Sequence, residues 1–526
     1  MKRFAALLET LILTPSRNRK IAALHDYLAT VPDPDRGLAV AAITRDLTLR
    51  HVKPALLRGL AESRVDPVLF NLSYDYVGDL AETVALIWPR QRGGVLPTLG
   101  DFVAAVESLP KDQIADQVAA WLDIATPNER RAMIKLATGG LRVGVSARLA
   151  KTALAAYGGQ PLAEIEHIWH GLKPPYDALF AWLDGRAARP EVDHTQTFHP
   201  MMLAHPIDLA RDLAAMAPGD FQAEWKWDGI RVQVITYGGD TRVFSRTGDD
   251  ITRAFPDLAD SVRGAAVLDG ELLVGADFQP LDFNCLQQRL NRKTPLKSHL
   301  STYPAFVRAY DMLFDGDEDI RALPLVARRR RLAAWLTANS QSRIDLSAAV
   351  RFADWNHLAA LRATGTNSGG HEGLMLKRAD SAYVAGRPKG LWFKWKRDPK
   401  VVDAVIMYAQ RGHGKRSSYY SDFTFGVWRD DVLVPIGKAY SGFTDVELGR
   451  LDKFVRGNTV ARFGPVREVA KTLVVEVAFD SAHASPRHKS GIALRFPRIS
   501  RIRWDKPAGE VESLAAIKAQ LLAAEG

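Results

Sequence analysis

The sequence predicts a multidomain protein in which an all-α region is followed by an α+β region and then by a small β-barrel. Three observations predict this: the length of the chain and two changes in the spacing of its apolar residues. The chain has 526 residues, which at roughly 150 residues per domain corresponds to three or four domains. Hydrophobic residues make up 47% and charged residues 25%, which excludes collagen, a disordered chain and a membrane bundle.

Residues 1–198 are predicted to be helical. Apolar residues recur there at spacings of three and four, as in FAALLETLIL, DLAETVALIW and ARLAKTALAAY. Proline and glycine separate these segments, for example at Pro32-Asp33-Pro34 and Gly139-Gly140. We therefore expect an all-α domain over residues 1–198.

Residues 199–399 are predicted to mix strands with helices. FQAEWKW, GIRVQVITY, AVLDGELLV, AFVRAYDMLF, GLMLKRA and LWFKW are predicted strands, and VARRRRLAAWLTA has helical spacing. Residues 400–526 are mostly strands, including VVDAVIMYA, DFTFGVW and TLVVEVAF, followed by a helix at SLAAIKAQLLAA. Short strands at this spacing are typical of a small barrel.

The excess positive charge lies in two windows. The formal net charge is +10. Residues 386–416 hold nine Lys or Arg against two acids, and residues 487–506 hold seven against one. Such concentration favours a polyanionic partner, because neutralising phosphates releases counterions. A solvated basic face is the alternative, although aromatic and glycine residues interrupt the cations in GRPKGLWFKWK and ALRFPRISRIRWDK.

Cysteine usage and the N-terminus bear on location. Cys285 is the one cysteine, which excludes a disulfide within the chain and a Cys-rich zinc site. Glu9 and Thr10 interrupt the first apolar stretch, and no signal-cleavage pattern follows it. Apolar runs elsewhere fall short of the ~18 residues that a membrane span needs. We expect an intracellular protein without a membrane segment.

A candidate nucleophile, Lys226, lies in the segment KWDGIR (residues 226–231), where a strand enters an Asp-Gly turn. A lysine attacks poorly at its free pKa of about 10.4, so a catalytic site must lower that pKa by burial and neighbouring cations. Lys394 and Lys396 alternate with aromatic residues and should share one face of a strand. Taken alone, KWDGIR also fits an ordinary β-turn with charged flanks.

Further segments accompany KWDGIR in a fixed order. They are Ser245-Arg246-Thr247-Gly248, Leu268-Asp269-Gly270-Glu271, FVRAYDML (306–313), EGLMLK (372–377), WFKWK (392–396) and Arg503-Trp504-Asp505-Lys506. With these motifs the chain resembles the ATP-dependent DNA ligases, within the nucleotidyltransferases that form a covalent lysine-nucleotide adduct. The resemblance implies a helical DNA-binding domain (1–198), an ATP-grasp-like adenylation domain (199–399) and an OB-fold (400–526).

The resemblance implies a catalytic role for Lys226, Lys394, Lys396, Asp505 and Lys506, and a nucleotide-binding role for Lys377 and Arg503. Lys226 would attack the α-phosphate of ATP and hold AMP, which then passes to a 5′-phosphate at a nick before the 3′-hydroxyl displaces it. Lys377, Lys394 and Lys396 would hold the α-phosphate and depress the pKa of Lys226. Arg503, Asp505 and Lys506 would orient the pyrophosphate from the barrel.

The resemblance also implies the nucleotide, metal and DNA contacts. Glu224 is expected near the adenine, Tyr310 is expected to stack on it, and Arg231 and Arg246 suit phosphate or ribose recognition. Glu271 and Glu372 are expected to contact the ribose or Mg²⁺, for which Mn²⁺ could substitute. Expected contacts with the DNA backbone are Arg142, in a segment (140–146) similar to the ligases' helical domain, and Arg411, Lys415 and Arg416.

Other classes share parts of this pattern. NAD⁺-dependent ligases carry a four-cysteine zinc finger, which one cysteine excludes. An mRNA-capping-type guanylyltransferase shares the lysine and the barrel, but not the helical first 198 residues. A non-catalytic DNA-binding protein with a ligase fold would be expected to lose catalytic positions that are present here. We expect a monomer that acts on nicked duplex DNA in a bacterial cytoplasm, associated with the nucleoid.

Overall fold

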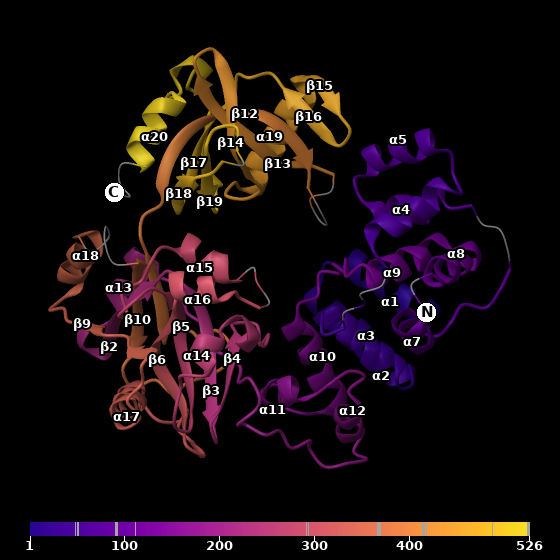
Figure 1. The fold of residues 1–526 in the computed structure, drawn as a ribbon. Coiled ribbons are helices and arrows are strands. Elements are labelled where there is room, and N and C mark those ends of the chain that lie inside the picture. Colours follow the sequence, from indigo (N-terminus) through magenta and orange to yellow (C-terminus); the bar gives the residue numbers. More distant parts are fainter. Residues whose placement is uncertain are drawn as a thin grey trace. The chain divides into compact units, whose positions relative to one another are not determined.

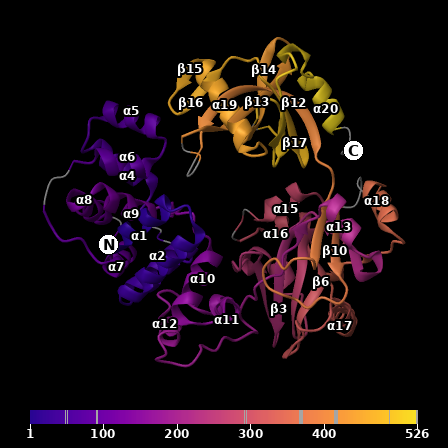
Figure 2. The same ribbon diagram turned by 180° about the vertical axis from the view of Figure 1, so that it is seen from behind.

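The computed structural model describes residues 1–47, 49, 52–89, 93–110, 112–290, 292, 294–364, 370–412, 416, 418–486 and 488–522. Its helices and strands are shown from two sides in Figures 1 and 2, and contacts within the chain divide it into two compact units. The first comprises Met1–Gln160, Pro174–Ala188 and Pro399–Gly526, and the second comprises Pro161–Lys173 and Arg189–Asp398. Over these described ranges, no helix is both long and apolar enough to cross a membrane.

The N-terminal region is helical, as predicted. Its helices are α1 (Lys2–Leu13), α2 (Arg17–Thr30), α3 (Asp35–Thr44), α4 (Pro54–Glu62), α5 (Pro67–Val77), α6 (Leu80–Ile87), α7 (Leu99–Ser108), α8 (Ile114–Ile124), α9 (Pro127–Ala137), α10 (Ala147–Gly158), α11 (Leu162–Ile168) and α12 (Asp177–Leu183). Thr98 and Thr126 start α7 and α9 with capping boxes that satisfy exposed backbone N–H groups. Leu11, Val84 and Leu99 are fully buried in the shared helical core.

The second unit contains two antiparallel-rich sheets in its described residues. One has the order β4-β3-β5-β6-β7 with β8 beside β6, and the other has the order β1-β11-β10-β2-β9. The strands are β1 (His205–Pro206), β2 (Phe221–Trp227), β3 (Ile230–Tyr237), β4 (Asp240–Ser245), β5 (Ala266–Val274), β6 (Ala305–Asp315), β7 (Glu318–Asp319), β8 (Ile344–Leu346), β9 (Ala349–Val350), β10 (His371–Arg378) and β11 (Trp392–Lys396). Strand β2 leaves one sheet and turns at Asp228-Gly229 into β3 of the other, so both sheets meet at this turn.

Six α-helices accompany these sheets within the described part of residues 189–398. They are α13 (Leu209–Ala215), α14 (Pro256–Ala259), α15 (Phe283–Leu290), α16 (Lys297–Thr302), α17 (Leu325–Ala338) and α18 (Trp355–Thr364). Each sheet has its own apolar core, one containing Val232, Leu268 and Leu332 and the other containing Ala223, Leu374 and Leu358. A further apolar cluster packs Ile235 and Val267 against Trp392, and charged residues lie beside aromatic ones in the cavity between the sheets.

The C-terminal part is a strongly curved antiparallel sheet. It is built from β12 (Lys400–Arg411), β13 (Tyr420–Arg429), β14 (Val432–Ala439), β15 (Thr459–Phe463), β16 (Val466–Val469), β17 (Val474–Phe479) and β20 (Arg498–Arg503). The first half of β12 pairs with β17 and its second half with β16, so this strand bends through the sheet. The pair β18 (Ser481–Ala484) and β19 (Ile492–Arg495) and the helices α19 (Asp445–Gly457) and α20 (Leu514–Leu522) complete it.

Candidate active site

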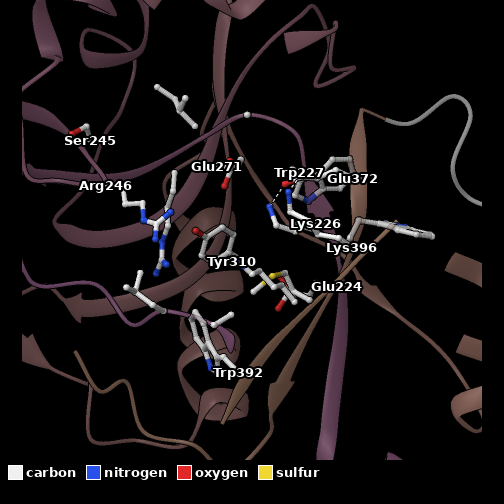
Figure 3. Close-up of a pocket in the computed structure, with 18 of the residues that line it drawn as sticks. Glu224, Lys226, Trp227, Ser245, Arg246, Glu271, Tyr310, Glu372, Trp392 and Lys396 are labelled. Atoms are coloured by element: carbon white, nitrogen blue, oxygen red, sulfur yellow. Dashed lines mark hydrogen bonds and ion pairs between the residues drawn. The ribbon is translucent and has the colours of Figure 1, made fainter. Parts of the chain in front are cut away.

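A cavity of about 640 Å³ lies between the two sheets of the second unit (Figure 3). We call it the central cavity. Strands from both sheets line it: β2, β10 and β11 from one, and β3, β5 and β6 from the other. Most of the charged residues predicted as site residues line it, namely Glu224, Lys226, Arg231, Arg246, Glu271, Glu372, Lys377, Lys394 and Lys396.

Lys226 and Lys396 share one carboxylate in this cavity. The Lys226 ammonium donates to Glu372 Oε1, and Lys396 Nζ lies 3.0 Å from Glu372 Oε2 (Figure 3). Burial opposes ionisation of Glu372, but the two ammonium groups outweigh it and hold the pKa of Glu372 below its ordinary value. Lys226 is thereby held at the end of β2, with its side chain 22% exposed.

A bulge in β10 is what turns Glu372 into the cavity. Between His371 and Leu374, β10 advances three residues while its partner β2 advances two. Without the extra residue, Glu372 would lie on the buried face with Leu374 and Leu376, because successive side chains alternate between faces. The bulge requires Gly373, whose φ is +133° and whose missing Cβ would lie 2.3 Å from the carbonyl oxygen of Trp395.

Lys394 and Arg246 are cations without an anionic partner among the described residues. Lys394 lies on the same face of β11 as Lys396, as its spacing predicted. Burial, reinforced by the charges of Lys396 and Lys226, lowers the pKa of Lys394. Arg246 is exposed in the loop after β4 and also lines the cavity. These cations leave the cavity ready for an anionic ligand.

A buried ion pair forms the floor of the cavity. Glu224 Oε1 lies 3.0 Å from Lys377 Nζ and 3.2 Å from Arg329 Nη1. Lys377 Nζ also lies 4.1 Å from the centroid of the Tyr310 ring and 4.7 Å from that of Trp392. Burial lowers the pKa of Lys377, although Glu224 opposes this shift. Lys377, expected on the α-phosphate, is thus engaged with Glu224 beneath the aromatic rings.

Arg231 is held by the protein itself. Its Nε and Nη2 donate to the two oxygens of Asp269 at 2.9 and 2.5 Å, and its side chain is only 14% exposed. Tyr383 donates its hydroxyl to the same carboxylate at 2.7 Å. The bidentate pair that we expected Arg231 to offer a phosphate or ribose is therefore directed at Asp269.

Glu271 lies opposite Arg231 across β3 and β5, on the face that lines the cavity. It accepts no hydrogen bond from any residue that the structure describes. Burial raises its pKa to about 7, although Lys226 and Arg231 pull it down and Glu372 raises it further. Two carboxylates within electrostatic reach of each other fit a hard divalent cation, which prefers oxygen ligands. Three or more acidic, His or Cys side chains do not form a metal-binding group anywhere in the described residues.

Three predicted residues, Arg503, Asp505 and Lys506, lie at or just after the end of β20 in the other unit. Arg503, at the end of β20, lies 3.4 Å from Asp403 of β12 and 3.1 Å from Asp505. Lys506 Nζ lies 2.8 Å from the same Asp403 oxygen. This motif is therefore organised around a carboxylate 100 and 103 residues earlier in the chain.

The predicted DNA contacts also lie in that unit. Arg142 is exposed in the loop before α10, and buried Lys20 holds this loop by donating to the carbonyls of Val143 (3.0 Å) and Gly144 (2.9 Å). Arg411 lies 5.9 Å from the centroid of the Tyr420 ring, and Arg416 donates to the carbonyl of Tyr440 at 3.4 Å. Lys415 lies outside the described residues.

Asp269, Tyr383, Arg329 and Asp403 contribute to these sites and were not predicted. Asp269 stands in the quoted segment LDGE, two residues before Glu271, so strand period two could have placed both on one face. Arg329 lies in the run of four arginines on α17. No local pattern distinguishes Tyr383 or Asp403.

Two sheets around a lysine-lined cavity define a nucleotidyltransferase-type ligase domain, and comparison with known proteins identifies its family. Residues 201–396 match the ATP dependent DNA ligase domain, and residues 416–506 match the ATP dependent DNA ligase C terminal region. A probable DNA ligase of Koribacter versatilis is 31% identical over 98% of this chain and 95% of its own length. One of Opitutus terrae is 31% identical over 100% of this chain and 62% of its own length. The solved structure Pmar-Lig_PreS3 shares the fold, with a TM-score of 0.61 and 18% identity over 95% of this chain and 99% of its own.

The chain belongs to the ATP-dependent DNA ligase family. It is an enzyme that uses ATP and acts on DNA. The comparisons favour neither a capping-type guanylyltransferase nor a non-catalytic DNA-binding protein.

Proposed function

We propose that the central cavity binds ATP and that Lys226 is the nucleophile. Its Nζ would form a bond to the α-phosphorus while the bond from that phosphorus to pyrophosphate breaks. The proton leaving Nζ has Glu372 Oε1 as its hydrogen-bonded acceptor. The observation that carries this proposal is Lys226 at the end of β2, in a cavity whose cations Lys394 and Arg246 have no anionic partner among the described residues.

Different residues of the cavity would contact the adenine, the ribose and the phosphates of ATP. Tyr310 and Trp392 offer aromatic faces to the adenine, and Glu224 lies beside them at the floor. Lys394, Lys396 and Arg246 would balance phosphate charge that develops as pyrophosphate leaves. Glu271 is free to accept a hydrogen bond from a ribose hydroxyl.

Glu271 and Glu372 would also hold Mg²⁺, or Mn²⁺ in its place. The metal supplies positive charge to the phosphate oxygens when it is bound. Glu372 would need to give up Lys226 or Lys396 to serve as a metal ligand, so metal binding and release of one of these two lysines would be linked.

The AMP would pass from Lys226 to the 5′-phosphate at a nick in duplex DNA, and the 3′-hydroxyl would then displace it. Arg503, Asp505 and Lys506 would act in the first step, in which the two cations orient the departing pyrophosphate. Arg142, Arg411 and Arg416 are proposed to contact the DNA backbone, together with Lys415. Domains 1–198 (all-α, DNA-binding), 199–399 (adenylation) and 400–526 (OB-fold) are proposed for these tasks.

Labelling with ATP tests the nucleophile. The protein is incubated with α-labelled ATP or GTP and Mg²⁺, denatured, and examined for covalent label. We expect label from ATP, none from Lys226→Ala, and normal labelling of Lys389→Ala, which replaces an exposed lysine outside the cavity. Label that persists in Lys226→Ala, or label from GTP alone, would overturn the assignment.

Separate experiments test the DNA substrate, the oligomeric state and the cellular location of the enzyme. Sealing is expected for a nicked duplex with a 5′-phosphate and to be lost when that phosphate is absent. We propose that the enzyme is a monomer in the bacterial cytoplasm, associated with the nucleoid. Light scattering of the purified chain should give a mass near 58.1 kDa, and fluorescence microscopy of a tagged chain should show it over the nucleoid.

A further inference from the structure

A second depression adjoins the central cavity in the same unit. It has a volume of about 980 Å³, and Ile251 and Leu290 line both hollows. We call it the lateral depression. It is lined by β4 and by residues 250–254, the segment that leads into α14, and β4 and α14 are neighbours in Figure 1. The two hollows are thus neighbours that share these two apolar side chains in their walls.

Arginines give the lateral depression its charge. Arg242, Arg253 and Arg292 line it, together with Asp240 and Asp250. Arg242 lies 3.8 Å from Asp240, which offsets its charge. Asp250 Oδ1 accepts hydrogen bonds from the backbone N–H (3.0 Å) and the hydroxyl (2.6 Å) of Thr252.

Arg253 and Arg292 remain exposed, and neither forms an ion pair with a described residue. Their environment therefore matches that of Arg246 in the central cavity. An exposed cation without a partner is often no more than a solvated surface charge. Here hydrogen bonds fix the two chain segments that carry these arginines relative to each other.

The buried Arg289 joins these two segments. It lies in the last turn of α15 and donates from Nη2 to the carbonyl of Ala254 at 3.0 Å and to Asp257 Oδ1 at 2.7 Å. Ala254 directly follows Arg253, and the backbone N–H of Arg292 donates to the carbonyl of Arg289 at 3.2 Å. The segments that carry Arg253 and Arg292 are therefore joined through one fully buried side chain.

The loop between the two hollows is also held in place. The backbone N–H of Ile251 donates to the carbonyl of Val243 at 2.9 Å, and that of Ser245 donates to the carbonyl of Asp249 at 2.8 Å. Arg246 on this loop lines the central cavity, and Arg253, just beyond it, lines the lateral depression. Cations therefore line both hollows, and backbone hydrogen bonds hold the loop between them.

We infer that the lateral depression seats the phosphodiester backbone of a DNA strand whose end enters the central cavity, with Arg253 and Arg292 on its phosphates. This inference rests on the proposed function, because it needs a strand end at Lys226. A guanidinium suits the task, since it can donate two parallel hydrogen bonds to a phosphate. Both arginines are positioning residues and take no part in the chemistry.

The test compares the full-length chain with the double variant Arg253→Ala/Arg292→Ala. Binding is measured by anisotropy on a nicked duplex whose 3′ end is a dideoxynucleotide, so that it cannot be sealed. We expect affinity to fall about tenfold and the slope of log K against log salt to become shallower by about 2, one per phosphate contact. The rate of covalent labelling by ATP should stay within about twofold of the wild type.

A matched control is Arg330→Ala. Arg330 is an exposed arginine of α17 without an ion pair among the described residues, and it lines neither hollow. An equal loss of affinity in Arg330→Ala would show a general charge effect and overturn the inference. So would an unchanged salt slope in the double variant, or a parallel fall in labelling.

Neutral methylphosphonate linkages, placed one at a time in either strand flanking the nick, locate the contact. A linkage that weakens binding by the wild type but not by the double variant supports the inference, and its position identifies the strand. The absence of any such position would overturn it. A wild-type chain that neither takes up label nor seals would refute the proposed function, whereas normal sealing by the double variant would refute this inference alone.

Discussion

Arg231 and Asp269 form a bidentate pair at the central cavity that Lys226 also lines, with N–O distances of 2.9 and 2.5 Å. Asp269 is completely buried, and Tyr383 donates to the same carboxylate. The two residues are 38 apart in sequence and meet because β3 and β5 pair in register. Arg231, which its motif predicts to bind a ligand, is thus also an ion-pair partner that stabilises the wall of the cavity.

Removing the charge of Asp269 should therefore destabilise the protein. Asp269→Asn leaves Arg231 as a buried charge without its anion, which costs about 3 kcal/mol, or roughly 6–12 °C in the Tm of this unit. Scanning calorimetry measures this decrease in Tm. In the control Asp319→Asn, which breaks a partly exposed pair with Arg321, the loss should stay below about 1 kcal/mol. If Arg231 served only to bind a ligand, Asp269→Asn would leave the Tm unchanged and would raise only the KM for ATP.

Gly373→Ala should disrupt the bulge that presents Glu372. The added Cβ would meet the carbonyl oxygen of Trp395 and force alanine into a φ of +133°, at a cost of about 1–3 kcal/mol. We expect labelling by ATP to fall at least about tenfold. Gly219→Ala, where nothing lies within 4 Å of the new Cβ, should label normally. Wild-type labelling by Gly373→Ala would mean that the bulge is dispensable.

Glu224 and Lys377 should behave as a coupled pair. Glu224→Gln strands two buried cations and should cost about 3 kcal/mol of folding free energy. Lys377→Met in that background relieves part of the loss, because one of the stranded charges disappears. A double-mutant cycle in urea should give a coupling energy of about 1–3 kcal/mol. Simple additivity of the two single losses would contradict the pairing.

His199 should make the stability of the second unit sensitive to acid. Burial, and then the charge of Arg321, lower its pKa to about 3, against about 6.5 in the unfolded chain. Between these values the unfolded state binds the extra proton, so stability is complete above pH 6.5 and is lost as the pH falls. The loss amounts to about 2 kcal/mol at pH 5.

Comparing the Tm at pH 7 and pH 5 tests this. His199→Gln should show a smaller drop than the wild type, whereas His25→Gln, at a half-exposed position, should show the same drop. Equal pH dependence in all three proteins would exclude His199 as the cause.

Lys506→Ala should separate the two halves of the reaction. The proposed contact of Lys506 with pyrophosphate matters only for labelling, so labelling should fall at least about tenfold, while sealing of a pre-adenylated nick stays near the wild-type rate. Arg501→Ala, at an exposed position on β20, should leave both steps unchanged. Equal impairment of both steps in Lys506→Ala would contradict the assigned role.

Local sequence patterns predicted several helices and strands of this protein at their observed positions. The segments FQAEWKW and AVLDGELLV coincide with β2 and β5, and VARRRRLAAWLTA lies within α17. Period-two spacing also placed Lys394 and Lys396 on one face. These outcomes follow because the direction of a side chain within one strand or helix depends only on its neighbours in sequence.

Only the tertiary structure decided which charges meet. The pairs Arg231–Asp269, Lys226–Glu372 and Lys506–Asp403 join residues 38, 146 and 103 positions apart. Such pairs depend on strand register and on a single inserted residue such as the one at Gly373, which no local period records. The sequence by itself therefore predicted the ligase family and the charged residues that line the cavity, while tertiary folding decided which of those cations the protein neutralises and which, like Lys394 and Arg246, have no anionic partner among the described residues.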